Sequence, residues 1–203
     1  MYPKTHIDAT GLGFDFDGVI ADTAATFLRL ACEQHNHCDF RLEEITDFEV
    51  EDCLGLPPDI VHSLFYQIMA DSLGVGLEPM PGALQVLTAL SRSCTVHVIT
   101  ARRLAQPVHD WFATVLPAKV CENINLVAMG DHDDKVRHVR QLGLTAFIDD
   151  RVETCLQLSS AGLHPIVFQQ PWNQGRHDLQ SVANWQQIGA LLNLNAPAQQ
   201  GAW

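Results

Sequence analysis

The chain has 203 residues, 47% of them hydrophobic, and a formal net charge of −12, from twelve basic and twenty-four acidic residues. This composition supports one substantial core and excludes a fibrous or disordered chain, and the negative charge argues against binding to long nucleic acid or an anionic membrane. No window reaches the ~18 consecutive apolar residues of a membrane span, and the first residues lack the pattern of a secretory signal, so we expect a soluble, cytoplasmic protein.

Five short apolar runs, rich in valine, isoleucine and phenylalanine, predict buried strands. They cover residues 11–16, 95–100, 123–129, 145–150 and 165–169. Between the later runs, the segments 104–116, 133–143 and 152–162 have the length and pattern of helices, and the last two end on a glycine. Strands that alternate with helices predict an α/β fold in which helices cover both faces of a parallel sheet.

The interval from about residue 22 to residue 80 is too long for one crossover helix and predicts an inserted helical subdomain. Within it, residues 57–70 begin with two prolines and carry an apolar stripe at helical spacing. Residues 80–90 predict the helix that returns the chain to the core. We therefore divide the chain into a catalytic core (1–22 and 80–195), a helical insert (23–79) and a flexible tail (196–203).

Cysteines and histidines do not form a recognisable metal-binding or redox motif. The six cysteines are scattered and include no Cys-x-x-Cys pair, so we expect most of them to be reduced packing residues. His35 and His37 lie two residues apart and would not share a helical face, which favours a solvated loop over a metal site.

Polar residues stand where the predicted strands end. Asp15 and Asp17 close the first run, Thr100 closes the second, and Asp149 and Asp150 close the fourth. Lys135 stands near the start of the helix before the fourth run. In an open parallel sheet, residues at the carboxyl ends of the strands converge on one crevice, so we expect these side chains to form one site.

The composition of that crevice points to phosphoryl chemistry. Crowded carboxylates repel one another unless a cation lies among them, and Mg²⁺ suits a set of oxygen ligands. The lysine and the hydroxyl would bind the oxygens of a phosphoryl group. One carboxylate can then attack phosphorus while another protonates the leaving oxygen.

In order and context, the segment DFDGVIAD (15–22), Thr100, Lys135 and the IDD segment (148–150) resemble the four motifs of the haloacid dehalogenase-like superfamily of phosphohydrolases. The match covers the core from about residue 12 to residue 150 and implies a Rossmann-like core. An aspartate two residues after the first is similar to the phosphatases and phosphomutases of that superfamily, and a small helical cap in the position of the insert is similar to many members.

The resemblance also implies roles for individual residues. Asp15 would be the nucleophile that forms an aspartyl-phosphate, and Asp17 would be the general acid and then the general base. Asp15, the Asp17 carbonyl, Asp150 and Asp149 would form the Mg²⁺ site, with Asp150 favoured as the direct ligand. The phosphoryl oxygens would be bound by Thr100, Ala101, Arg102 and Lys135, although arginines near helix starts are also common as surface residues.

The expected substrate is a small phosphorylated metabolite. The segments 147–154, 168–173 and 184–188 resemble the 5′(3′)-deoxyribonucleotidases and related bacterial nucleotidases, which favours a nucleoside 5′-monophosphate. Phe40, Phe48, Phe65 and Tyr66 are the aromatic candidates for contact with a base. The stripe of Phe65, Ile68 and Met69 favours packing within the insert over a ligand pocket.

Two alternatives remain open. A sugar-phosphate phosphatase, another metabolite phosphatase or a phosphomutase would use the same motifs. A catalytically silent module that binds a phosphorylated ligand or a protein would be expected to lack Asp15, Asp17 or the late acid pair, and all of these are present. The sequence does not indicate an oligomeric state.

Overall fold

The computed structural model describes residues 7–130 and 134–194. Its centre is a parallel six-stranded sheet in the order β3-β2-β1-β4-β5-β6. The strands are β1 (Leu12–Phe14), β2 (Val96–Thr100), β3 (Ile124–Ala128), β4 (Ala146–Asp149), β5 (His164–Phe168) and β6 (Ser181–Val182). The five predicted strands and the α/β class are confirmed, and β6 is an additional edge strand.

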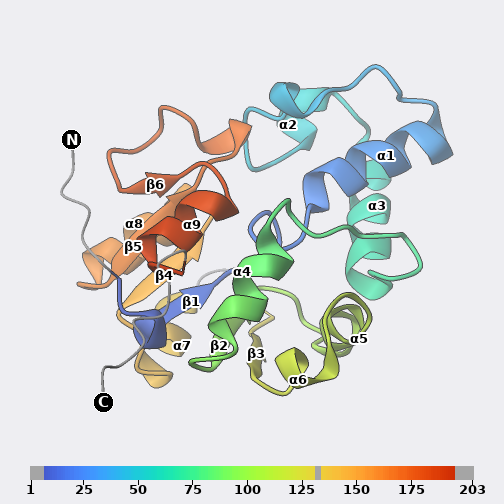
Figure 1. Cartoon of the computed structure of the whole chain (residues 1–203). Helices are drawn as coiled ribbons and strands as arrows, with labels where there is room; N and C mark the ends of the chain where they lie inside the picture. The colour runs from blue at the N-terminus through green and yellow to red at the C-terminus, as the bar shows by residue number, and fades with distance from the viewer. Residues whose placement is uncertain (1–6, 131–133, 195–203) are drawn as a thin grey trace, which may run out of the picture.

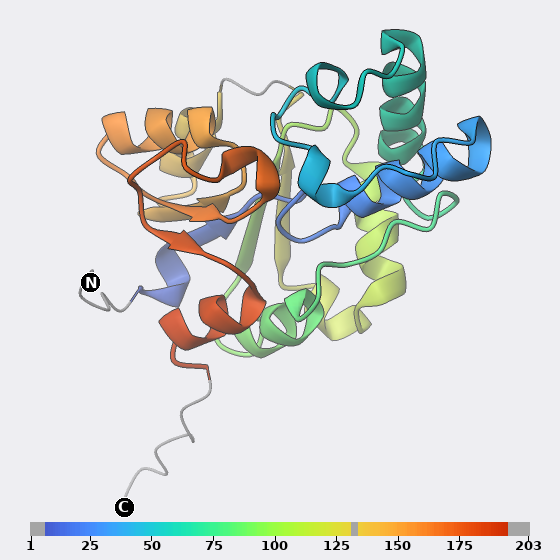
Figure 2. The ribbon, with the colours of Figure 1, turned by 90° about the horizontal axis from the view of Figure 1, so that it is seen from above.

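Helices cover both faces of this sheet (Figures 1 and 2). They are α4 (Ala83–Leu90), α5 (Gln106–Val115), α6 (Ala118–Cys121), α7 (Lys135–Gln141), α8 (Val152–Ser160) and α9 (Trp185–Leu191). On one face, Val139 of α7 and Leu158 of α8 pack with Phe147 of β4. On the other face, Trp185 of α9 stacks on Phe14 of β1 with ring centroids 5.3 Å apart. The structure also has three short 3-10 helices, η1 (Ala9–Gly11), η2 (Leu42–Glu44) and η3 (Pro171–Asn173).

The expected helices of the insert are present. They are α1 (Thr23–His35), α2 (Glu51–Leu54) and α3 (Pro58–Ala70), which Figure 1 shows grouped at one end of the sheet. Phe27 of α1 stacks on Phe65 of α3 with centroids 4.8 Å apart. The boundaries of the insert and the core stay a prediction, and the predicted tail lies outside the described residues.

One disulfide departs from the expectation of reduced cysteines. It joins Cys32, in the last turn of α1, to Cys38 in the loop that follows. Asn36 adopts a left-handed conformation directly after the helix, with φ of 60°, and so turns the chain back toward Cys32. Cys53, Cys94, Cys121 and Cys155 are free, in line with the prediction for most of the six.

Among the described residues, no helix is long and apolar enough to cross a membrane.

Candidate active site

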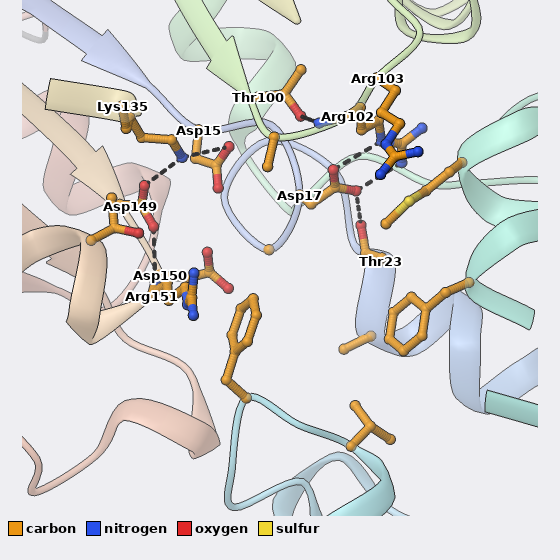
Figure 3. Close-up of a pocket in the computed structure, with 18 of the residues that line it drawn as sticks. Asp15, Asp17, Thr23, Thr100, Arg102, Arg103, Lys135, Asp149, Asp150 and Arg151 are labelled. Atoms are coloured by element: carbon orange, nitrogen blue, oxygen red, sulfur yellow. Dashed lines mark hydrogen bonds and ion pairs between the residues drawn. The ribbon is translucent and has the colours of Figure 1, made fainter. Parts of the chain in front are cut away.

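The eight predicted site residues all line one cavity of about 670 Å³ at the carboxyl ends of β1, β2 and β4. Figure 3 shows their acidic and basic side chains converging from these elements. They are Asp15, Asp17, Thr100, Ala101, Arg102, Lys135, Asp149 and Asp150. The convergence follows from the parallel sheet, which brings residues more than a hundred positions apart to the same edge.

The loop after β1 holds its two acids in a tight turn. The backbone N–H of Asp15 donates to the Ile148 carbonyl over 2.8 Å, which ties the start of the loop to β4. Gly18 has φ of +70°, and a Cβ atom there would lie 2.2 Å from Oδ2 of Asp150. Glycine at this position therefore allows the loop to approach the acid at the end of β4 closely.

Lys135 joins two of the buried acids. Its Nζ lies 2.6 Å from Oδ2 of Asp149 and 3.2 Å from Oδ1 of Asp15. Burial would lower the pKa of Lys135, but Asp149 and Asp15 outweigh it and raise the pKa, so the amine stays charged. Asp149 is fully buried, and its other oxygen accepts the backbone N–H of Arg151 over 2.9 Å. Both oxygens of Asp149 are thus hydrogen-bonded within the protein.

The late loop around η3 holds Asp150, a contact that our sequence reasoning did not find. The indole N–H of Trp172 donates to Oδ2 of Asp150 over 3.1 Å, and the Asn173 amide donates to its backbone carbonyl over 2.8 Å. Gln170 donates to the Gly18 carbonyl over 2.7 Å and so fixes the opposite loop. The proline, tryptophan and asparagine directly after β5 were the available signal.

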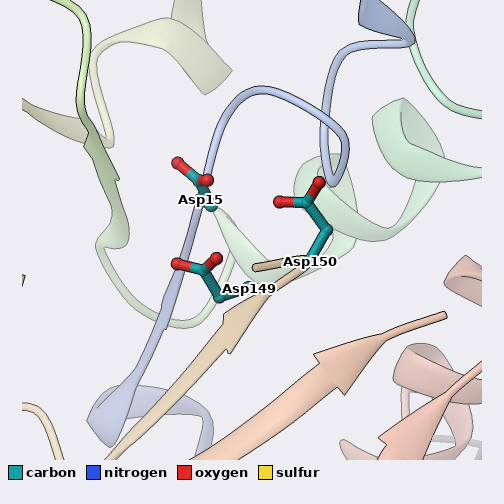
Figure 4. Close-up of side chains that lie close together, drawn as sticks. All are labelled: Asp15, Asp149 and Asp150. Atoms are coloured by element: carbon teal, nitrogen blue, oxygen red, sulfur yellow. The ribbon is translucent and has the colours of Figure 1, made fainter. Parts of the chain in front are cut away.

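Three carboxylates form a group with the spacing of a metal site (Figure 4). One oxygen from each of Asp15, Asp149 and Asp150 lies within 4.8 Å of the others. Burial, the largest cause, together with Asp149 and Asp17, raises the pKa of Asp15 to about 7 despite Lys135. Burial and the neighbouring acids also raise the pKa of Asp150 well above its usual range. This acidic triad would be stabilised in its ionised form by a hard divalent cation, which its oxygen donors fit.

Asp17 has a different environment from the triad. Arg102 donates from Nε to Oδ2 over 2.9 Å and from Nη2 to Oδ1 over 2.7 Å, and the Thr23 hydroxyl donates to Oδ1 over 2.6 Å. Burial alone would raise the pKa of Asp17, but Arg102 and Thr23 hold it below its usual value. The two acids of the loop therefore have pKa values shifted in opposite directions, as expected for groups with different chemical tasks.

The phosphate-binding set was predicted from Thr100, Ala101, Arg102 and Lys135. Thr100 is buried at the end of β2, and its hydroxyl accepts the backbone N–H of Arg102 over 3.2 Å. Ala101 lies between them at the cavity wall. The Arg102 side chain is directed to Asp17, and its role at a phosphoryl group stays a prediction.

The wall of the cavity opposite the acids is apolar and comes mainly from the insert. Three of the four aromatic candidates, Phe48, Phe65 and Tyr66, line it, and so does Met69, for which packing within the insert was expected. Phe65 combines this position with packing on Phe27. Phe40 stacks on His37 instead, with centroids 5.4 Å apart, and is not among the lining residues.

Arg151 also lines the cavity, and our sequence reasoning did not single it out. Its guanidinium lies 4.8 Å from the centre of the Phe48 ring, so the charge of the core packs against an aromatic residue of the insert. Its position directly after the Asp149–Asp150 pair was the available signal.

Comparisons with known proteins identify the family of this chain. The profile of the family described as 5′ nucleotidase, deoxy (pyrimidine), cytosolic type C protein matches residues 9–199. The chain belongs to this family. It is 23% identical over 181 residues to a nucleotidase of Clostridium acetobutylicum, an alignment that covers 88% of this chain and 91% of the relative.

Solved structures show the same fold at lower identity. A haloacid dehalogenase-like family hydrolase from Streptococcus pneumoniae has a TM-score of 0.56 at 13% identity, over 89% of this chain and 97% of that chain. CbbY from Rhodobacter sphaeroides, in complex with phosphate, has a TM-score of 0.55 at 15% identity, over 91% and 99%. The predicted superfamily is confirmed, and the chain is an enzyme of the haloacid dehalogenase-like phosphatase and nucleotidase class.

Proposed function

We propose that this family member is a magnesium-dependent phosphomonoesterase that acts through an aspartyl-phosphate on a nucleoside 5′-monophosphate, with a deoxyribonucleotide as one candidate. The observation that carries the proposal is the meeting, in one cavity, of the Asp15 and Asp17 pair, the Lys135 amine and an aromatic wall. The acids fit the chemistry of phosphoryl transfer, and the wall fits a nucleobase.

In the first half of the reaction, a carboxylate oxygen of Asp15 forms a bond to phosphorus, and the bond between phosphorus and the ester oxygen breaks. Asp17, which Arg102 and Thr23 keep ionised at rest, takes up a proton before this step and gives it to that oxygen, which leaves as the nucleoside hydroxyl. Lys135 and Thr100 bind the phosphoryl oxygens, and Lys135 also balances the charge of Asp149.

In the second half, water attacks phosphorus while the Asp17 carboxylate takes a proton from it, and the bond to Asp15 breaks to release phosphate. Because Arg102 and Thr23 lower the pKa of Asp17, its carboxylate is ionised and available to take this proton.

Asp15 and Asp150 would be direct side-chain ligands of the cation. Among the described residues, Oδ2 of Asp150 accepts one hydrogen bond, from Trp172, whereas both oxygens of Asp149 are engaged. Asp149 would therefore act as the neighbour that orients Lys135. When bound, Mg²⁺ would neutralise the phosphoryl oxygens and let the acidic triad ionise together.

The substrate class rests on the aromatic wall and on the family. Phe48, Phe65 and Tyr66 present aromatic surface to the cavity, and aromatic rings stack on nucleobases. A sugar-phosphate phosphatase or a phosphomutase is the second candidate, because the acids and Lys135 do not depend on what the insert recognises.

The test is phosphate release with Mg²⁺ from a panel of nucleoside monophosphates, their deoxy forms and sugar phosphates, with Asp15→Asn as the blank. We expect faster release from nucleotides, lost in the variant. Much faster release from sugar phosphates would overturn the nucleotide assignment. Transfer of the phosphoryl group to a second substrate hydroxyl, in place of release, would identify a mutase.

A further inference from the structure

Arg102 makes two parallel hydrogen bonds to Asp17. Nε and Nη2 of one guanidinium face Oδ2 and Oδ1 of one carboxylate, at 2.9 and 2.7 Å (Figure 3). The Arg102 guanidinium also lies 4.9 Å from the centre of the Phe16 ring. A bidentate pair fixes the plane of a carboxylate as well as its place, because both oxygens are held by one rigid group.

The remaining nitrogen of Arg102 reaches the insert. Nη1 donates to the Ser72 hydroxyl over 2.7 Å and to the Ile68 carbonyl over 3.4 Å. The Ser72 hydroxyl in turn donates to the same Ile68 carbonyl over 3.0 Å. Ile68 is in the last turn of α3, and Ser72 follows that helix. The buried guanidinium thus connects the loop after β1 to the end of α3.

This arrangement leaves Arg102 little capacity for a phosphoryl group. A guanidinium has five N–H donors, and four of them are used by Asp17, Ser72 and Ile68. Its exposed fraction is 3%. Binding a phosphate through two nitrogens would require Arg102 to release at least one of these three partners.

Asp17 keeps one acceptor position toward the cavity. An ionised carboxylate can accept about four hydrogen bonds. Among the described residues, Oδ1 accepts from Arg102 and Thr23, whereas Oδ2 accepts from Arg102 alone. The side chain is 26% exposed and lines the cavity. The oxygen with the remaining position is therefore Oδ2.

We propose that Arg102 is a positioning residue that turns Oδ2 of Asp17 toward the leaving oxygen of the substrate and, through Ser72, ties this orientation to the end of α3. The inference rests on the proposed function, because it assigns Asp17 the proton transfer. In this role Arg102 affects the reaction by orienting Asp17 and does not bind the phosphate directly.

The test compares two leaving groups in the first turnover of Arg102→Lys, which keeps the charge and loses the planar fork. A nucleoside monophosphate releases an alkoxide that needs a proton, whereas p-nitrophenyl phosphate releases a phenolate that does not. We expect first-turnover release of the nucleoside to slow by about 10- to 100-fold, within the range of general acid catalysis. Release of p-nitrophenol should stay within about threefold of wild type, with KM little changed.

A second comparison uses the Asp17→Asn background. Because Arg102 would act through Asp17, adding Arg102→Lys to Asp17→Asn should slow nucleoside release no further. Arg92→Lys is the matched control, since Arg92 is exposed and outside the cavity lining, and it should behave as wild type.

Ser72→Ala keeps the inference testable if Arg102→Lys does not fold, as judged by its thermal unfolding. This variant removes only the hydroxyl that Arg102 contacts and should show the same dependence on leaving group to a smaller degree. Wild-type nucleoside release in Ser72→Ala would then overturn the link to α3.

Three results overturn the role of Arg102: equal slowing of both leaving groups with a raised KM, a further loss in the Asp17→Asn background, or wild-type rates in Arg102→Lys. If wild type itself releases no nucleoside or phosphate from any substrate, it is the proposed function that fails.

Discussion

The indole nitrogen of Trp172 donates a hydrogen bond to Oδ2 of Asp150 over 3.1 Å, and this bond joins the loop after β5 to the acidic triad. Trp172 is buried, and the neighbouring Asn173 holds the backbone of the same aspartate. The orientation of a carboxylate from β4 therefore depends on a segment that follows it by more than twenty positions. Such outer contacts orient metal ligands and tune their affinity.

Trp172→Phe tests this dependence. The variant keeps an aromatic ring in the same place and removes the N–H donor, so Asp150 loses a fixed orientation. We expect the Mg²⁺ dissociation constant to rise by about tenfold, measured by calorimetric titration of the wild type and the variant. An unchanged dissociation constant would show that Asp150 is oriented without Trp172.

The acidic triad predicts a pH-dependent stabilisation by metal. The pKa of Asp15 is raised from 3.8 to about 7, and that of Asp150 is also raised, so ionisation of these groups favours the unfolded chain. Their penalty is absent below the unfolded pKa, grows as the pH rises from the unfolded to the folded pKa, and is complete above the folded pKa. Mg²⁺ offsets it, so we expect the increase in Tm on adding Mg²⁺ to be larger at about pH 8 than at about pH 5.

Thermal unfolding of wild type and Asp150→Asn, with Mg²⁺ and with a chelator, checks this prediction. The variant should lose most of the increase at the higher pH. Equal increases at the two pH values in wild type would contradict the account of the triad.

Tyr66 provides a test of the aromatic wall that spares the core. Its side chain lines the cavity and is 73% exposed, so Tyr66→Ala removes a stacking surface without opening a buried void. We expect KM for a nucleoside monophosphate to rise by about 5- to 150-fold, which corresponds to the ~1–3 kcal/mol of base stacking. KM for ribose 5-phosphate, which has no aromatic ring, is the control and should change little. A parallel rise for both substrates would place the base elsewhere.

The sequence was sufficient to predict the residues that close strands. Asp15, Thr100 and Asp149 meet because the carboxyl ends of parallel strands share one edge, and this rule needs only the order of strands along the chain. Lys135 does not close a strand, and it was found from its place at the start of the helix before the fourth predicted strand and from the order of the motifs. The two-residue strand β6 was missed because it is too short to show alternation.

The contacts made between separate segments could not be predicted. The contacts of Arg102 with Asp17 and Ser72 are an example. They depend on the position of α3 over the loop after β1, which distance along the chain does not reveal. The pairing of Cys32 with Cys38 depends on how the chain turns at the end of α1, at Asn36. The Arg102 contacts depend on how the insert packs on the core, and the disulfide depends on a local turn within the insert; periodicity and spacing encode neither.

The central claim is that Asp15 carries the phosphoryl group, and the most direct measurement is peptide mass spectrometry of enzyme quenched in acid during turnover of a nucleoside monophosphate. We expect a phosphorylated peptide that contains Asp15, and its absence in Asp15→Asn, which should fold as wild type and lose turnover. Turnover without any phosphorylated peptide, a phosphoryl group on another residue, or undiminished activity in Asp15→Asn would contradict the account.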